Sequence, residues 1–322
     1  MLTRAVVVVF IALNLLLNET AHANDSAVDI AVGGLKLRKE HSVVIQKERL
    51  FISKNLVTVE YEFQNTTNTP VVSEVSFPIP SFHYIFDKGP RDFSDFTAWI
   101  NGEPIDVKKE VRAFVKGREV TKDLHRAGIA IETFGNFDPS DPMSSTFALN
   151  PESRKKLVDI GALKNRDKKT PLEYWPEWEV HIKYHWTQEF PAKTLVHIKH
   201  VYKPVAGYSP VQIQKFKQEY KDTCVTNATF SEVKKRVADA MRLEPLGNNY
   251  FGVVWVSYIL TTANTWQTPI KDFELLVQGE NNDLPTFCWE GPIEKLDQNR
   301  LRAHKTDYVP KKDLKIYFLT NF

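Results

Sequence analysis

A strict alternation of apolar and polar side chains constrains the fold of this chain more than any other feature. It is clearest just past the middle of the sequence, where every second residue is large and apolar: Trp178, Val180, Ile182, Tyr184 and Trp186. A period of two places these side chains on one face of an extended strand. Because a strand with one apolar face must bury it, the alternation predicts a sheet packed against another layer.

The same pattern predicts strands earlier in the chain. Residues 43–53 and 57–63 lie on either side of a Ser-Lys-Asn turn, which predicts a hairpin. A third strand is expected at residues 71–77 and should stop at Pro78 and Pro80, because proline lacks the N–H that a strand ladder needs. Three such strands in succession are typical of an antiparallel meander or of one end of a β-sandwich.

Further strands are expected later in the chain. Asn101-Gly102 is typical of a two-residue hairpin turn, so residues 97–100 and 104–107 should pair. Residues 195–202 follow a turn at 190–193 and are expected to form a second hairpin with the alternating strand. The remaining strands should lie at residues 250–260, 273–277, 286–289 and 314–319.

Four short helices are expected between these strands, two at residues 121–131 and 151–163 and two that open with capping boxes. Their candidate caps are Thr121, Asn150, Ser209 and Thr229. The sequence therefore predicts an α+β, β-dominated fold, with an antiparallel β-sandwich-like body and short helical insertions near residues 121–170 and 209–243. We expect residues 24–322 to form a single domain, since no linker or repeat divides them.

Residues 1–23 have the organisation of a secretory signal peptide. One cation, Arg4, precedes a largely apolar run over residues 5–17, and the small residues Ala21 and Ala23 suit signal peptidase. The run is shorter than the roughly 20 apolar residues of a membrane span, and no later segment is long and apolar enough. We therefore expect export to the periplasm or the outside, with no transmembrane segment after cleavage.

The charge balance argues against a polyanionic partner. The chain has 42 Lys and Arg against 40 Asp and Glu, a formal net charge of +2. Nucleic-acid binders neutralise phosphates with many cations, so we expect no nucleic-acid partner.

Two cysteines, Cys224 and Cys288, are the only ones in the chain. An exported chain meets oxidising conditions, which favours a disulfide between them. Closing a loop of this length stabilises a fold by roughly 4 kcal/mol in the chain-entropy model. The alternative is that a cysteine such as Cys224 serves as a nucleophile or a metal ligand, although neither cysteine has a histidine or a second cysteine close by in sequence.

Common catalytic, nucleotide-binding and metal-binding motifs are absent from the sequence, so we expect no catalytic residue, no metal and no cofactor. The alternative is a hydrolase or metal site built from His181, His185 and His197, which lie on the polar faces of two expected strands. Histidine is also an ordinary occupant of a solvated sheet face, and we favour that interpretation. His200 faces the other way and is expected to be a hydrogen-bonded residue of the core or of a sheet edge.

Three weaker candidates also have ordinary structural explanations. The segment with Asn136, Asp138, Ser140 and Asp141 has oxygen-bearing residues spaced as in a calcium loop. It lacks the glycine and the closing glutamate of such a loop, so turn formation explains these residues better. Four aromatic residues could stack on a sugar or peptide, but their spacing favours the core: Trp175, Trp178, Tyr184 and Trp186. A basic run could contact anionic lipid, but interspersed acids favour a solvated face: Arg154, Lys155, Lys156, Lys164, Arg166, Lys168 and Lys169.

Several ordered motifs resemble bacterial domain-of-unknown-function family 4424 over nearly the whole mature chain. The motifs are Gly33-Gly34-Leu35, Val57-x-Val59-x-Tyr61-x-Phe63, Phe77-Pro78-Ile79-Pro80, Tyr184-x-Trp186-x-Gln188-x-Phe190-Pro191-Ala192 and Phe287-Cys288. The resemblance implies an exported β-rich protein and assigns no activity. Residues 55–120 are also similar to the vault/inter-α-trypsin inhibitor domain, an interaction module, but without its accompanying metal-ion adhesion motif.

Together these observations predict an exported, noncatalytic β-rich protein that binds an envelope protein, a peptide or a glycan. The alternative function is an envelope hydrolase or metal-binding protein that uses the histidine cluster or Cys224.

Overall fold

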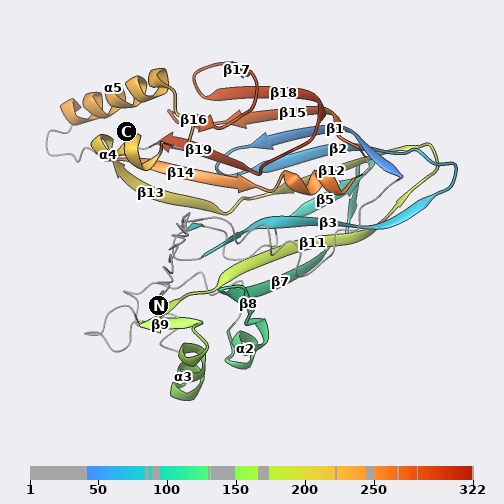
Figure 1. Cartoon of the computed structure of the whole chain (residues 1–322), viewed down its shortest axis with the longest axis horizontal. Helices are drawn as coiled ribbons and strands as arrows, with labels where there is room; N and C mark the ends of the chain where they lie inside the picture. Colours follow the sequence, from blue (N-terminus) through green and yellow to red (C-terminus); the bar gives the residue numbers. More distant parts are fainter. Residues whose placement is uncertain are drawn as a thin grey trace, which may run out of the picture.

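Strands dominate the computed structural model of the chain (Figure 1). The structure describes residues 42–83, 87–88, 95–129, 131, 149–165, 174–221, 223–243, 250–266, 268–280 and 282–320. The expected signal peptide and the candidate calcium loop lie outside these residues. The β-dominated α+β class is confirmed.

The largest sheet has eight strands in the order β17-β18-β15-β1-β2-β12-β5-β6. Their bounds are β17 Ile293–Lys295, β18 Arg300–Tyr308, β15 Ile270–Gln278, β1 Val43–Ile52, β2 Val57–Asn65, β12 Leu195–Tyr202, β5 Thr97–Ile100 and β6 Glu103–Ile105. The predicted hairpins β1–β2 and β5–β6 are both present, and Asn101 and Gly102 adopt φ of 53° and 91°, as such a turn requires. Among the described strands only β1 and β15 pair in parallel.

A second sheet has four strands in the order β3-β11-β7-β8: β3 Val71–Phe82, β11 Glu179–Phe190, β7 Lys108–Val115 and β8 Arg118–Glu119. The prediction that β3 stops before the prolines was wrong, because Pro78 and Pro80 both lie within it. Strand β3 lies at the edge of its sheet and pairs only with β11. Its other side has no partner strand among the described residues, so a proline whose nitrogen faces that side costs no hydrogen bond of the sheet, and two prolines two positions apart face the same side. Of the two arrangements expected for the first three strands, the meander was wrong, because β3 and β2 belong to different sheets, whereas one end of a β-sandwich agrees with two sheets that pack on each other.

The chain crosses between these two sheets at residues 190–195. The predicted hairpin of β11 with β12 was wrong: β11 pairs with β3 and β7, whereas β12 pairs with β2 and β5. Asn65 holds this corner, because its fully buried amide donates to the carbonyls of Thr69 and Phe190, each at 2.8 Å.

A third sheet has five strands in the order β16-β19-β14-β13-β4: β16 Leu284–Phe287, β19 Leu314–Thr320, β14 Tyr250–Tyr258, β13 Ala206–Gln212 and β4 Asp87–Lys88. Gly207 of β13 carries the Trp255 ring directly over its backbone, where an added Cβ would come within 1.9 Å of that ring. The short strands β9 Leu163–Asn165 and β10 Tyr174–Pro176 form a separate pair, and a 3₁₀ turn spans Thr261–Thr265.

The described α-helices are α2 Thr121–Arg126, α3 Pro151–Asp159, α4 Ile213–Glu219 and α5 Asn227–Leu243. Asn150 caps α3 as predicted, accepting from the Ser153 N–H at 2.8 Å. The other caps were wrong. Thr121 instead accepts from the Ala113 N–H of β7, Ser209 lies inside β13, and α5 begins earlier than expected, with Thr226 accepting from the Thr229 N–H.

Two hydrophobic cores lie between these elements. In the larger one the four-stranded sheet packs face to face on the eight-stranded sheet: Tyr184 of β11 stacks on Phe96 at 3.9 Å, and Trp186 meets His200 of β12 at 5.3 Å. The smaller core lies under α4 and α5, against the five-stranded sheet, and contains Val211, Phe216, Val233, Val237, Phe251, Val253, Leu284 and Leu319. The single-domain organisation of residues 24–322 stays a prediction.

The predicted disulfide is present between Cys224 and Cys288. It joins the connection between α4 and α5 to the residue that follows β16. None of the helices in the described part of the chain has the length and apolar composition needed to cross a membrane.

Candidate functional site

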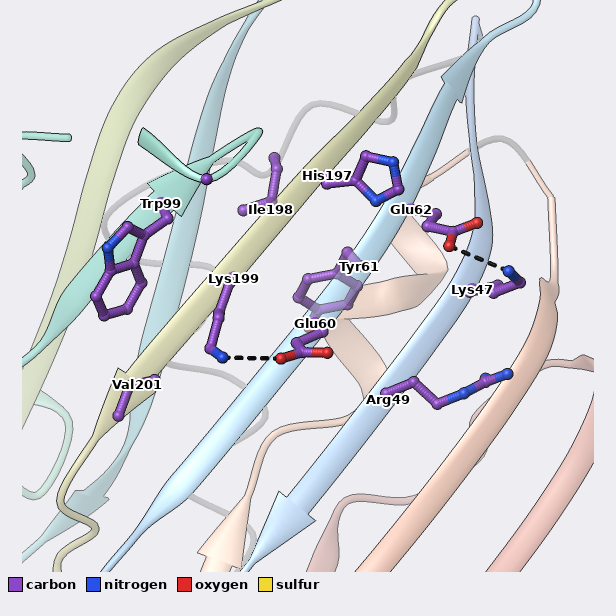
Figure 2. A pocket seen from close by; sticks show the side chains of 11 residues that line it. Lys47, Arg49, Glu60, Tyr61, Glu62, Trp99, His197, Ile198, Lys199 and Val201 are labelled. Carbon is purple, nitrogen blue, oxygen red and sulfur yellow. Dashed lines mark hydrogen bonds and ion pairs between the residues drawn. The ribbon is translucent and has the colours of Figure 1, made fainter. Parts of the chain in front are cut away.

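A groove of about 570 Å³, lined by charged and aromatic residues, crosses the outer face of the eight-stranded sheet (Figure 2). Strands β1, β2 and β12 form its floor, and β5 with the following turn forms one side. The groove exists because the residues between the buried ones on these strands are polar and share one face. The charged or aromatic residues that line it are Lys47, Arg49, Glu60, Tyr61, Glu62, Trp99, His197 and Lys199.

The strand register arranges the charges of the groove in rows of alternating sign. Glu62 of β2 lies opposite Lys47 of β1 on one side and His197 of β12 on the other, and Glu60 lies likewise between Arg49 and Lys199. The Lys47 and Glu62 side chains form an ion pair at 3.1 Å, and the Lys199 and Glu60 side chains form one at 2.9 Å (Figure 2).

The rows continue beyond the groove onto β15. Arg49 forms an ion pair with Asp272, and His304 Nε2 lies 2.7 Å from the same carboxylate. The hydrogen bond from Arg49 holds the pKa of Asp272 below its ordinary value. Single exposed pairs add at most about 1 kcal/mol to stability, so the main effect of this network is to hold the donors and acceptors of the groove in place.

Trp99 forms the aromatic side of the groove. It lies directly across from Lys199 in the β12–β5 register, and its ring stands at the margin of the floor (Figure 2). The neighbouring turn is fixed to β12, because the Asn101 N–H donates to the His197 carbonyl at 2.8 Å and the Asn101 side chain accepts from the His197 N–H at 2.9 Å. The indole is therefore carried by a rigid backbone.

A buried carboxyl lies beneath the groove. Glu48 is 1% exposed and faces the core from β1, where its Oε1 accepts from the Tyr258 hydroxyl of β14 at 3.5 Å. The Tyr258 and Tyr61 hydroxyl oxygens are 3.1 Å apart. Burial raises the pKa of Glu48 to about 8, so the carboxyl holds its proton at neutral pH.

A buried histidine occupies the same layer. His200 of β12 is surrounded by the rings of Tyr61, Phe77, Phe96 and Trp186, with centroids 4.9 to 5.8 Å away. Neither ring nitrogen has a hydrogen-bond partner among the described residues. Burial lowers the pKa of His200 to about 3, so the imidazole is neutral in the folded protein. The expected core position is confirmed, whereas the hydrogen bond expected for His200 is not present among the described residues.

The candidate histidine cluster is not assembled. His181 and His185 lie on β11 of the four-stranded sheet, where they approach Glu179 at 3.4 Å and Glu74 at 3.5 Å, whereas His197 lies in the groove on the other sheet. The hydrolase or metal site was inferred from a β11–β12 hairpin that does not form. Over the described residues, no group of three His, Cys, Asp or Glu side chains is placed to hold a metal ion.

Cys224 is bonded to Cys288 and offers no thiol, which removes the candidate nucleophile.

The other candidates of the sequence have ordinary places in the structure. Trp178, Tyr184 and Trp186 are core residues, as their spacing favoured, and Trp175 is half-buried. In the basic run, Lys155 pairs with Asp159 and Lys156 with Glu152 on exposed α3. Arg166, Lys168 and Lys169 lie outside the described residues.

The groove was missed from sequence because its residues come from four separate strands. The available signal was that polar residues occupy the positions between the buried ones on neighbouring strands, as Glu60 and Glu62 do between the core residues Val59 and Phe63. Glu48 was also recognisable, because it stands on the face of β1 that the alternation with Leu50 and Ile52 assigns to the core.

Among curated proteins, none matches the chain. Three solved structures with distant similarity are a candidate nutrient-binding protein of Legionella pneumophila, native yeast LTA4 hydrolase and an M1 zinc metallopeptidase of Deinococcus radiodurans. Their identities are 15%, 10% and 8%, and their TM-scores 0.45, 0.28 and 0.30. The alignments cover 88%, 87% and 87% of this chain, and 68%, 29% and 43% of the respective structures. With such TM-scores they support no functional conclusion.

The resemblance of residues 55–120 to the vault/inter-α-trypsin inhibitor domain stays a prediction.

The profile of a domain of unknown function, DUF4424, matches residues 23–317, which is nearly the whole chain and includes every strand of the groove. The chain therefore belongs to the DUF4424 family.

Proposed function

We propose that the protein is an exported, noncatalytic binding protein and that the groove on its eight-stranded sheet takes a polar peptide or glycan. The observation that carries this proposal is Trp99, whose ring stands beside ion-paired side chains that are fixed in register across the strands. An aromatic surface next to a few placed donors and acceptors is the usual composition of a ligand site, and a volume of about 570 Å³ lies within the range of such sites.

The chemistry of the groove suits binding better than catalysis. Its carboxylates are each paired with a lysine, Glu60 being exposed and Glu62 half-buried, and no serine or cysteine of the described residues lines it. A catalytic acid or base usually depends on burial or on a neighbouring charge to bring its pKa near the working pH. We therefore assign these carboxylates to hydrogen bonding with the ligand.

Export is supported by two features. Residues 1–23 have the pattern of a signal peptide, and the Cys224–Cys288 disulfide belongs to an oxidising compartment. Expression of the full chain in a Gram-negative host, followed by osmotic shock, should release a shortened product that begins after Ala23. A full-length product in the cytoplasmic fraction would contradict export.

Ligand binding is tested with a panel of short peptides and of neutral and charged oligosaccharides, screened by calorimetry. Trp99→Ala should weaken the binding of a panel ligand by roughly 5- to 150-fold, because aromatic stacking is worth about 1–3 kcal/mol where it has been measured on bases. Trp175→Ala, on the separate β9–β10 pair, is the matched control and should leave binding unchanged. Equal affinity of Trp99→Ala and the wild type, or equal weakening by both variants, would exclude the groove.

A further inference from the structure

The pair of helices at one end of the molecule forms a second surface that the groove does not use (Figure 1). A shallow depression of about 370 Å³ runs along α4 and α5. Its lining is mostly apolar: Ile213, Gln214, Phe230, Lys234, Val237, Ala238 and Met241. Met241 is 41% exposed, so apolar surface faces solvent here.

Charge is concentrated around this depression. Residues 213–243 contain seven Lys or Arg and four Asp or Glu, a net charge of +3, whereas the whole chain carries only +2. The rest of the protein is therefore slightly acidic in balance. The helical end therefore presents a local positive field that attracts an anionic partner.

The available cations are lysines. Arg236 pairs with Glu232 at 2.8 Å and Arg242 with Asp239 at 3.1 Å, so both arginines are already engaged. Four exposed lysines on these helices form no ion pair with any carboxylate of the described residues: Lys215, Lys217, Lys234 and Lys235. Two of them, Lys217 and Lys234, lie over the Phe230 ring, with their Nζ atoms 5.9 and 4.6 Å from its centroid.

The type of cation distinguishes between two anionic partners. Recognition of carboxylates on a structured protein favours the planar, bidentate guanidinium of arginine. Lysine presents a point charge on a flexible stem, which suits phosphates that move in a fluid layer, and its stem can lie along apolar surface while the ammonium reaches outward. Exposed Met241 and half-buried Phe230 between such lysines match the interfacial pattern of apolar residues flanked by cations.

We propose that the α4–α5 face docks on the surface of an anionic phospholipid membrane. The lysines contact the lipid phosphates, while Met241 and the edge of Phe230 enter the headgroup region. The disulfide at Cys224, between the two helices, ties this face to the sheet behind it, so the helices dock as part of the folded protein. The groove lies on a different sheet and does not take part in this contact.

The test is sedimentation of the purified protein with vesicles of phosphatidylcholine alone and of phosphatidylcholine mixed with phosphatidylglycerol, at low and high salt. We expect partition onto the mixed vesicles only, and its loss at high salt. The double variant Lys217→Gln/Lys234→Gln should lower the partition coefficient roughly 30-fold, at about 1 kcal/mol for each basic residue near an anionic surface. Met241→Gln should lower it further.

The matched control is Lys311→Gln/Lys312→Gln, which removes the same charge from exposed lysines at the opposite end of β19. This control should keep wild-type partition, and urea unfolding should show that every variant is folded. Absence of partition by the wild type, or equal losses in the two double variants, would overturn the proposal. Tight binding of an amphipathic helical peptide with Leu on one face and Glu on the other, without vesicle binding, would assign the face to an acidic protein instead.

Discussion

Replacing Glu48 with glutamine should change how the stability of the protein depends on pH. The folded protein holds the pKa of Glu48 at about 8, whereas the unfolded chain titrates near the ordinary value of 4.5. Between these values the unfolded chain has lost a proton that the folded chain keeps, so the free energy of unfolding falls as pH rises. The slope is about 1.4 kcal/mol per pH unit, which gives about 5 kcal/mol over the whole window.

His200 produces the opposite slope at lower pH. Its pKa in the folded protein is about 3 against the ordinary 6.5, so the unfolded chain binds a proton in this range and the folded chain does not. The free energy of unfolding therefore rises with pH from about 3 to about 6.5, with the same slope. The two contributions cancel between pH 4.5 and 6.5, where we expect a plateau, and only the effect of Glu48 remains between pH 6.5 and 8.

The assay is urea unfolding at pH 4.5, 6.5 and 8, followed by tryptophan fluorescence with the disulfide intact. From pH 6.5 to 8 the wild type should lose about 2 kcal/mol relative to Glu48→Gln, which lacks the titrating group. From pH 4.5 to 6.5 the variant should gain about 3 kcal/mol relative to the wild type, because His200 then acts alone. His200→Asn is the reciprocal control and should decline steadily from pH 4.5 to 8. Parallel curves for wild type and Glu48→Gln would refute a protonated Glu48 in the core.

Two further predictions concern stability. Cys288→Ser should lower the free energy of unfolding by about 4 kcal/mol, since the disulfide closes a loop with a sequence separation of 64 residues; a loss below about 1 kcal/mol in urea unfolding would mean that the unfolded state is already compact there. Gly207→Ala should destabilise the protein by about 1–3 kcal/mol and shift the fluorescence maximum, because the added Cβ displaces the Trp255 ring that covers this backbone; an unchanged spectrum and an unchanged midpoint would contradict this placement of the ring.

Two local sequence signals predicted the local structure correctly, although three of the four expected helix caps were wrong. The β5–β6 hairpin follows from Asn101-Gly102, and the Asn150 cap follows from its own side chain and the proline after it, because both signals act within a few residues. Strand β18 was missed because it lacks such a local signal. Its sequence is polar at almost every position and buries only Ala303, so it has little apolar alternation to detect.

Long-range pairing could not be predicted in this way. Alternation identifies the buried face of a strand but does not say which sheet the strand joins, which is why β3 and β12 were both given wrong partners. The groove depends on that pairing, since Lys47 and His197 share it only because β1, β2 and β12 are neighbours. The charged residues of the groove are recognisable in the sequence, but which of them become neighbours depends on the order of the strands in the sheet.

The parallel pairing of β1 with β15 has a consequence for the order of assembly. The first described strand lies in the interior of the eight-stranded sheet, yet its partner residues, such as Asp272 opposite Lys47, come more than 200 positions later. A chain made from its N-terminus therefore holds a β1–β2 hairpin with one open edge until nearly all of the sequence is present. Such distant contacts are typical of slow folding, and an open edge in the meantime can pair with other chains. We expect this protein to need protection from aggregation until residue 278 has been released.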